Sequence, residues 1–371
     1  MNILFINNSL INDGGVETVL ASLSNHFQKE HNVSILVLGK KIDFNQDDFN
    51  GINIHFTGKH YRAKIAKNFI KHIEYKYFYY KKLANKINSL RPDLIIVMKD
   101  IHIELISKLL EYHSVDAYII GSLHNNYKLH DVKKYELREK YKNIDLLTVL
   151  TDEDKEFYSS FTQIPTFVMP NPLNLPNIKK DKDNIVLLVS RIEIDKRVDL
   201  FIKAVAICQD SLKNYKFIII GDGTKLCEMK ELAKDKNVNI EFLGRLSSYL
   251  TYEYFSKSKI FVLSSEMEGF PCVLQEAMFY NSAIVSTRYK GSSLNILIYD
   301  NEDGLICELD EYDMAEKIIK LANENQLRES MVKLAREKFF KLNYDTFNQW
   351  DKLIKNIRII NAININNTSN L

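Results

Sequence analysis

The chain has 371 residues, of which 46% are hydrophobic and 26% are charged, and its formal net charge at pH 7 is +2. This length exceeds what one hydrophobic core usually serves, so we expect two domains of roughly 150–200 residues each. The near balance of charge argues against a nucleic-acid binder with a strongly basic face. No apolar run approaches the roughly 18–20 residues that span a bilayer, and the first residues lack the basic start of a signal peptide.

Cysteine usage indicates a reducing compartment, so we expect a cytoplasmic protein. The cysteines lie in the second half of the chain without CxxC or other metal-ligand spacing, which suits small buried apolar side chains. They are Cys208, Cys227, Cys272 and Cys307. We expect no metal and no cofactor.

Short apolar runs of strand length alternate with segments of helical period along the first half. A buried strand is predicted at residues 3–6, followed by a glycine turn at 13–15 and a helix over about 16–28. Near-continuous apolar runs, rather than alternating ones, are typical of strands buried on both faces of a parallel sheet. Further strands are predicted at 33–38, 94–97, 118–123 and 146–150.

The same pattern restarts after Pro170-Asn171-Pro172 and the polar stretch 179–184. Two such series predict an α/β protein of two Rossmann-like, doubly wound domains that face each other across a cleft. We place the domains at 1–172 and 173–343, with a C-terminal helix at about 344–358 packing back on the first. The strands of the second series are predicted at 185–189, 217–220, 240–243, 260–263 and 283–285.

One segment departs from charge neutrality. Residues 59–86 hold nine Lys or Arg against one acid, Glu74, with five aromatic residues between Tyr75 and Tyr80. A basic helix with aromatic side chains can lie on anionic lipid headgroups, gaining about 1 kcal/mol per well-placed cation. A solvated helix whose aromatic side chains face the core would give the same pattern. Both interpretations stay open.

Residues 266–278, Glu-Met-Glu-Gly-Phe-Pro-Cys-Val-Leu-Gln-Glu-Ala-Met, follow a predicted strand. Pro271 suits the first position of a helix over about 271–280, which places Glu276 inside the helix and Glu268 on the preceding loop. Gly269 lets backbone approach a ligand closely, and the free N–H groups at a helix start suit phosphate. One carboxylate can bind a diol while the other faces a sugar.

The string Glu268-Gly269-Phe270-Pro271, then Leu274 and Glu276-Ala277-Met278, resembles the EGFP-x-x-L-x-EAM form of the E-x7-E signature. That signature marks the retaining glycosyltransferase family 4, whose fold is GT-B. The resemblance implies that Glu276 holds the ribose hydroxyls of a nucleotide-sugar, and that Glu268 and the backbone around Phe270 hold the donor sugar.

Residues 189–196 resemble the family's strand-then-GRL-x-x-x-K stretch, with Arg191 and Lys196 five positions apart. An Arg and a Lys on a loop between a strand and a helix can clamp a diphosphate. The resemblance implies that this pair stabilises the leaving phosphate. Ser190 stands where the family often has glycine, a mild departure that would tighten this turn.

Two further resemblances lie in the first half. Asp13-Gly14-Gly15-Val16-Glu17 is similar to the family's GG-x-E turn, which implies that Gly15 lies at the donor phosphate and that Gly14 and Glu17 lie at the acceptor. His124 follows a predicted strand, where the family commonly has a histidine near the reacting sugar. A lone histidine after a strand is more often structural, and His102 competes from inside a predicted helix.

Three shorter matches complete the resemblance. Gly221-Asp222-Gly223 resembles the family's G-x-G turn, residues 242–244 its FLG strand end, and Asn171 the NP pair at the interdomain junction. Asp152-Glu153-Asp154 mimics the metal-binding DxD of another glycosyltransferase fold. After Thr151 it is better explained as the acidic first turn of a helix.

The resemblance implies a retaining, metal-independent hexosyltransferase that forms an α-linkage in bacterial surface polysaccharide synthesis. Its donor is a nucleotide diphosphate sugar, UDP-linked on family frequency, and its acceptor is a hydroxyl of a glycan or a lipid-linked oligosaccharide. The second domain would bind the donor and the first the acceptor. We expect it on the inner face of the plasma membrane if 59–86 contacts anionic lipid. A GT-B epimerase, a phosphorylase and a non-catalytic binding subunit are the alternatives.

The predicted site residues fall into three groups. The catalytic group is His124, Glu268, Arg191 and Lys196. The donor-binding group is Gly15, Gly221, Gly244, Gly269, Phe270, Pro271, Leu274 and Glu276. The acceptor-binding group is Gly14 and Glu17.

Overall fold

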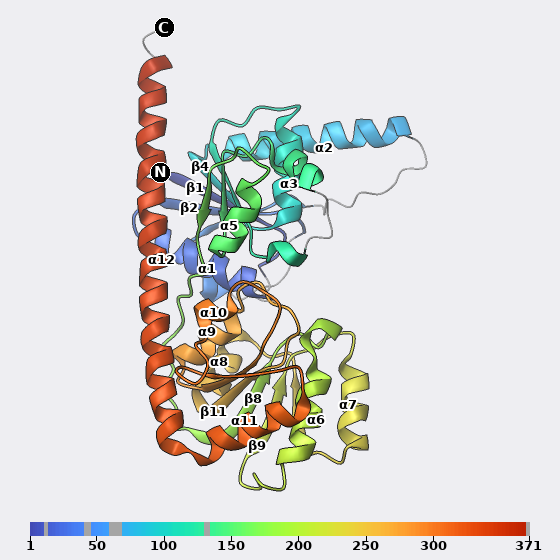
Figure 1. Ribbon diagram of the computed structural model, residues 1–371. Helices are drawn as coiled ribbons and strands as arrows, with labels where there is room; N and C mark the ends of the chain where they lie inside the picture. Colours follow the sequence, from blue (N-terminus) through green and yellow to red (C-terminus); the bar gives the residue numbers. More distant parts are fainter. Residues whose placement is uncertain (11–13, 41–45, 59–68, 130–133, 369–371) are drawn as a thin grey trace. The chain divides into compact units, whose positions relative to one another are not determined.

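The structure is a computed structural model that describes residues 1–10, 14–40, 46–58, 69–129 and 134–368 (Figure 1). The chain divides into two compact units. Unit 1 is Met1–Asn174 together with Asp345–Leu371, and unit 2 is Leu175–Tyr344. The boundaries expected from the sequence were 172 and 343.

Unit 1 contains a seven-stranded parallel sheet in the order β3-β2-β1-β4-β5-β6-β7. In the central strand, Phe5 pairs with Ile35 on one side and with Ile96 on the other, so both neighbours are parallel. The strands are β1 (Asn2–Asn7), β2 (Asn32–Val37), β3 (Asn53–Phe56), β4 (Leu94–Val97), β5 (Tyr118–Ser122), β6 (Leu146–Val149) and β7 (Thr166–Val168).

Helices cover both faces of this sheet. One face shares a buried core with side chains of α2–α5, while on the other Phe27 of α1 stacks on Phe5 and meets Trp350 of α12 edge-on. Helix α12 begins in unit 2, and its part from Asp345 onward belongs to unit 1. The helices are α1 (Gly15–Phe27), α2 (Phe69–Ser89), α3 (Asp100–Leu110), α4 (Lys134–Tyr141), α5 (Asp152–Ser159) and α12 (Asn325–Thr368).

Unit 2 contains a six-stranded parallel sheet in the order β10-β9-β8-β11-β12-β13. Helices α6, α7 and α11 share a buried core with one face of it, and α8 and α9 pack together against the other (Figure 1). The strands are β8 (Asp183–Val189), β9 (Lys216–Ile220), β10 (Ile240–Gly244), β11 (Ser258–Leu263), β12 (Ala283–Thr287) and β13 (Leu305–Cys307). The helices are α6 (Val198–Cys208), α7 (Leu226–Asp235), α8 (Ser248–Lys257), α9 (Cys272–Phe279), α10 (Leu294–Leu297) and α11 (Glu311–Asn323).

The predicted fold class of two Rossmann-like parallel-sheet domains is confirmed. Each predicted strand is present within one or two residues at most of its ends. Three strands were missed, β3, β7 and β13, and each is an edge strand of three or four residues. An edge strand that is short or partly exposed lacks the long apolar run by which a central parallel strand is recognised.

The basic segment 59–86 is only partly described. Residues 59–68 lie outside the described residues, and α2 covers the remainder. The aromatic side chains described in α2 differ in burial. Tyr80 is buried in the core, whereas Tyr77 and Phe78 are exposed. Membrane contact therefore stays a prediction. Within the described part of the chain, no helix combines the length and the apolar character that crossing a bilayer requires.

Candidate active site

The strand order of unit 2 reverses between β8 and β11, which are hydrogen-bonded neighbours. In open parallel sheets ligands bind outside the carboxyl ends of the strands at such a switch point. The loops 190–197 and 264–271 leave β8 and β11 at this edge. They are tied together, since the Glu266 N–H donates to the Asp195 carbonyl at 2.9 Å and the Ser264 hydroxyl donates to the Lys196 carbonyl at 2.7 Å.

Lys196 and Glu268 form an ion pair across this switch point. Lys196 Nζ lies 2.7 Å from Glu268 Oε1, which also accepts a hydrogen bond of 2.6 Å from Ser265 Oγ. Their side chains are 12% and 14% exposed, so the pair is largely shielded from water. The sequence analysis gave these residues to different parts of a donor, and the structure makes them partners. A ligand entering here meets a cation and an anion that already contact each other.

Arg191, the other half of the predicted clamp, is exposed. It lies near Glu193, whose carboxylate accepts hydrogen bonds from the Thr224 hydroxyl and the Thr224 N–H. Those bonds, more than Arg191 itself, lower the pKa of Glu193. Within the described residues the Arg191 guanidinium makes no hydrogen bond and no short ion pair, so it is available to an anion.

Glycines bring the loops after β8 and β9 into backbone contact. A Cβ on Gly221 would lie 1.8 Å from the Ser190 carbonyl oxygen, and Gly221 has φ +143°. A Cβ on Gly223 would lie 2.4 Å from the Ile192 carbonyl oxygen. Backbone packing between the two loops therefore requires glycine at positions 221 and 223. Gly244 differs, because it has φ +65° but open space around it.

Helix α9 presents Glu276 from a buried position. Its carboxyl group has no hydrogen-bond partner among the described residues, and burial raises its pKa from 4.5 to about 7. Such a group suits neutral hydroxyls, which can donate to it without bringing a charge.

The residues around Glu276 are mostly core. Leu274 is fully buried, and so is Gln275, whose amide atoms are buried without a hydrogen-bond partner in the described chain. Phe270 is buried as well, and Gly269 lies between it and Glu268 on the loop. Pro271 is the N-cap of α9 with ψ 111°, rather than its first helical residue as expected. The residue after Pro271 carries the first helical dihedrals, which moves the helix start by one position.

Unit 1 has its own switch point, between β1 and β4. Asn7 ends β1, and Lys99 follows β4. Both donate to one oxygen of Glu17 on α1, since Glu17 Oε1 lies 2.7 Å from Lys99 Nζ and 3.3 Å from Asn7 Nδ2. Glu17 is 4% exposed, whereas the side chain of Lys99 is 28% exposed. Lys99, rather than Glu17, is therefore the charged group that this edge offers to a ligand.

Lys99 was missed by the sequence analysis. A signal was available, because it stands two residues beyond the strand 94–97, where side chains of a parallel sheet gather at the carboxyl edge. A single lysine at a strand end is common, however, and nothing in the sequence linked it to Glu17, 82 residues earlier.

The turn before α1 does not need glycine at position 14 for its backbone conformation or its packing. Gly14 is the N-cap of α1 with φ −174°, and a Cβ there would meet Glu17 Oε2 at an ordinary 3.6 Å. Gly15 is the first residue of the helix, and Asp13 lies outside the described residues. Protein packing therefore does not require glycine at position 14, and close approach of a ligand remains the reason to expect it.

His124 follows β5 and is held by two hydrogen bonds. Its Nδ1 lies 2.8 Å from Asn171 Oδ1, and its Nε2 lies 3.1 Å from Ser122 Oγ, which accepts from the Thr148 hydroxyl. With the Asn171 oxygen facing the ring, Nδ1 carries the proton and Nε2 accepts. Burial lowers the pKa of His124 to about 4, so the ring is neutral at pH 7.

Asn171 was identified from sequence only as an interdomain marker, and the structure makes it the partner that sets the His124 tautomer. The competing histidine, His102, is buried on α3, and burial also lowers its pKa to about 4.

The acidic run 152–154 behaves as the first turn of α5. The Thr151 hydroxyl caps the helix by accepting from the Asp154 N–H, and Asp154 is buried. Among the residues that the structure describes, no group of three or more His, Cys, Asp or Glu side chains converges as a metal site would require.

Comparison with known proteins defines the class. Residues 175–338 match the family model "Glycosyl transferases group 1". A Campylobacter jejuni GalNAc-α-(1→4)-GalNAc-α-(1→3)-diNAcBac-PP-undecaprenol α-1,4-N-acetyl-D-galactosaminyltransferase is 29% identical over 382 residues, covering 96% of this chain and 99% of that protein. A Staphylococcus aureus poly(ribitol-phosphate) α-N-acetylglucosaminyltransferase is 26% identical over 227 residues, or 58% of this chain and 46% of that protein.

Solved structures give the fold. A mutant of S. aureus TarM, crystallised with Fondaparinux, α-GlcNAc-glycerol and UDP, has a TM-score of 0.77 at 17% identity, covering 95% of this chain and 99% of that one. The pneumococcal O-GlcNAc transferase GtfA, crystallised with UDP and GlcNAc, has a TM-score of 0.73 at 14% identity over 96% of this chain and 99% of that one.

The fold is therefore GT-B, and the class of protein is a glycosyltransferase. More particularly, most of unit 2, residues 175–338, matches the glycosyltransferase group 1 model, and the similar proteins named above come from bacteria.

Proposed function

We propose that the protein is a retaining hexosyltransferase that uses a UDP-sugar and forms an α-linkage to a hydroxyl of a glycan or lipid-linked acceptor in bacterial surface polysaccharide synthesis. The observation that carries the proposal is the arrangement at the β8–β11 switch point. There the Lys196–Glu268 pair, exposed Arg191 and buried Glu276 belong to the two loops and the helix that leave this sheet edge.

Unit 2 would hold the donor. Arg191 and Lys196 supply positive charge for the diphosphate, and Glu276 accepts hydrogen bonds from the two ribose hydroxyls. Glu268 holds hydroxyls of the sugar, and Lys196 fixes its position from 2.7 Å away. The solved structures of TarM and GtfA named above contain UDP, which supports this nucleotide as the carrier.

Departure of the nucleotide would be the step that these cations assist. As the bond between the sugar carbon and the diphosphate oxygen breaks, negative charge grows on that oxygen, and Arg191 and Lys196 stabilise it. The acceptor oxygen then bonds to the same sugar carbon from the side of the leaving group, which retains configuration. Its proton goes to the departing phosphate oxygen, so no carboxylate base and no metal ion are needed.

Unit 1 would hold the acceptor. Lys99 presents a cation that Glu17 orients, Asn7 donates to the same Glu17 oxygen, and Gly14 leaves room beside Glu17 at the start of α1. His124 is a positioning residue in this proposal, because Asn171 and Ser122 occupy both ring nitrogens.

Titration of the purified full-length protein with UDP, GDP and ADP, followed by calorimetry, tests the donor assignment. We expect UDP to bind more tightly than GDP and ADP, and Glu276→Gln to weaken UDP binding by roughly tenfold or more, because a charged acceptor of hydroxyl hydrogen bonds contributes about 1.5–3 kcal/mol. Glu241→Gln, on β10, is the matched control and should bind UDP as the wild type does.

Product analysis tests the reaction. Transfer of the hexose to an added glycan or undecaprenyl-linked acceptor, with an α-linkage by NMR, supports the proposal. Release of an epimerised nucleotide-sugar, or a sugar phosphate formed from inorganic phosphate, would replace it with an epimerase or a phosphorylase. UDP binding that Glu276→Gln leaves unchanged would refute the ribose role.

A further inference from the structure

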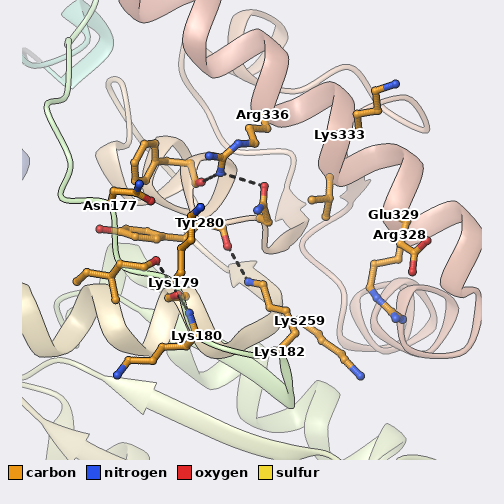
Figure 2. A pocket seen from close by; sticks show the side chains of 15 residues that line it. Asn177, Lys179, Lys180, Lys182, Lys259, Tyr280, Arg328, Glu329, Lys333 and Arg336 are labelled. Atoms are coloured by element: carbon orange, nitrogen blue, oxygen red, sulfur yellow. Dashed lines mark hydrogen bonds between the residues drawn. The ribbon is translucent and has the colours of Figure 1, made fainter.

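A basic pocket lies at the edge of the unit-2 sheet opposite the candidate donor site (Figure 2). Its lining includes Lys182, which directly precedes β8, Lys259 at the start of β11, and Asn281, two residues before β12. These are the amino ends of the strands whose carboxyl ends carry Lys196 and Glu268. Strands of six or seven residues separate the two edges by roughly 20 Å, so the pocket is a second location and not part of the donor site.

The pocket is concave and strongly cationic. It has a volume of about 640 Å³, and its lining contains five lysines and two arginines against one acid, Glu329. In Figure 2 Arg336 reaches from α12 over the pocket, while Lys179, Lys180 and Lys182 come from the segment that leads into β8. Positive charge therefore faces the same space from two different elements.

One partly buried cation of the lining, Lys182, is surrounded by neutral oxygens. Its Nζ donates to the carbonyls of Ser258 at 2.6 Å, Tyr280 at 2.7 Å and Phe255 at 3.2 Å, and Ser282 Oγ lies at 3.4 Å. All four are acceptors, which suits the ammonium form. Burial, with a smaller contribution from Arg336, lowers the pKa of Lys182 to about 7. The protein thus orients a cation here without giving it a counter-charge.

Arg336 and Lys259 follow the same pattern. Arg336 donates to the Phe279 carbonyl and to Asn281 Oδ1, and its guanidinium stacks on the rings of Phe279 and Phe340. Lys259 donates to the Asn184 amide oxygen at 2.6 Å. Only Lys180 of the lining lysines has an ion pair in the described chain, 3.1 Å to Glu253. Cations that outnumber the nearby carboxylates in this way repel one another unless an anion binds between them.

We propose that this basic pocket binds a phosphate-bearing ligand, whose anionic oxygens lie within reach of both walls. Phosphate oxygens match the planar fork of Arg336 and the point charges of the lysines. The pocket volume admits a diphosphate or the headgroup of an anionic phospholipid, and both present the same chemistry to these side chains. The site is independent of the donor site and of the proposed function.

Calorimetric titration of the full-length protein with inorganic pyrophosphate, without added metal, is the test. The variant K179Q/K333Q removes two exposed charges from opposite walls, so it should fold normally and bind pyrophosphate roughly tenfold or more weakly. The matched control K230Q/K234Q removes two exposed lysines from α7 and should bind as the wild type does. The variant R191Q should weaken only pyrophosphate binding at the candidate donor site, so it separates that binding from binding at the basic pocket. Equal affinity in K179Q/K333Q and wild type would overturn the proposal.

The substitution R336Q serves as an independent check, with thermal unfolding measured alongside because Arg336 also bonds to the end of α9. Sedimentation with phosphatidylcholine vesicles, with and without phosphatidylglycerol, distinguishes a lipid headgroup from a free phosphorylated molecule as the ligand. Binding to the anionic vesicles that K179Q/K333Q abolishes identifies a lipid headgroup. Pyrophosphate binding through these lysines, with vesicle binding absent or unaffected by the variant, identifies a free phosphorylated molecule. If K179Q/K333Q binds both pyrophosphate and anionic vesicles as the wild type does, the pocket binds no phosphate.

Discussion

Lys196 and Glu268 neutralise each other at 2.7 Å across the point where the unit-2 sheet reverses its strand order. The two residues are 72 positions apart in the chain, and Ser265 supports the shared carboxylate oxygen. A diphosphate or a sugar hydroxyl entering this edge would therefore bind to a cation or an anion whose position the protein has already set.

Replacing Lys196 by alanine should lower turnover by about 10²–10³-fold, as expected when one group that stabilises developing charge is lost. Glu268 would also lose its counter-charge in a largely shielded place, so we expect the free energy of unfolding to fall by about 1–3 kcal/mol. Steady-state kinetics and urea unfolding measure the two effects. Near-normal turnover by this variant would refute the clamp.

Two variants sharpen that experiment. In Lys196→Ala/Glu268→Ala the unpaired carboxylate is gone, so the stability should recover in part while the activity stays low. Lys203→Ala breaks a partly exposed i,i+4 pair with Asp199 in the same unit, and should cost at most about 0.5 kcal/mol.

Glu276 should make the protein pH-sensitive near neutrality. Burial raises its pKa from 4.5 to about 7, so between these values the native state binds a proton that the unfolded state has released. The contribution of Glu276 to the free energy of unfolding is therefore present below pH 4.5 and is lost as the pH rises through about 7, by roughly 3 kcal/mol. Urea unfolding across this range should show the slope, and Glu276→Gln should flatten it.

The affinity for the donor should also depend on the protonation of Glu276, but it should rise with pH where the free energy of unfolding falls. The carboxylate accepts hydrogen bonds from ribose hydroxyls better than the protonated acid does, so affinity for UDP should rise as the pH passes through about 7. Calorimetry at several pH values, with Glu276→Gln as the comparison, checks this. An identical pH profile in both proteins would assign the titration to another group.

Lys99 should matter more to activity than its isolated place in the sequence indicates. Lys99→Met leaves the Glu17 carboxylate, 4% exposed, without its cation, and we expect a loss of about 2 kcal/mol in the free energy of unfolding. Glu17→Gln keeps the shape and should destabilise less. If Lys99 binds the acceptor, Lys99→Met raises the KM for the acceptor more than the KM for the donor. Unchanged acceptor KM with lost stability would indicate a structural pair only.

Gly221 and Gly244, both with positive φ in unit 2, should respond differently to alanine. Gly221→Ala forces a Cβ to within 1.8 Å of the Ser190 carbonyl oxygen, so the loops after β8 and β9 must separate, at roughly 3 kcal/mol or more. Gly244→Ala meets no atom within 4 Å and should cost only the left-handed backbone, about 1 kcal/mol. Thermal unfolding compares them directly, and equal losses would contradict the packing argument.

The local pattern was enough to predict the central strands of both sheets and the loops that leave their carboxyl edges. Buried parallel strands such as β1 and β8 are nearly continuous apolar runs, and residues just beyond them must lie at the carboxyl edge of a parallel sheet. Glu268, Glu276, Arg191 and Lys196 were assigned to this edge in this way, and the roles that the family resemblance implies for them stay predictions. The edge strands β7 and β13 were missed, because three residues are too few to show a period.

The sequence by itself determined which residues lie at the two strand edges, since that depends on local periodicity and chain order. Only the tertiary structure decided which of them are partners. Glu17 takes Lys99 as its counter-charge, Asn171 sets the proton position on His124, and Lys182 is enclosed by carbonyl oxygens from distant elements. The physical reason is that hydrogen bonds and ion pairs act over about 3 Å in space, and strand crossover brings together residues whose separation along the chain carries no information about that distance.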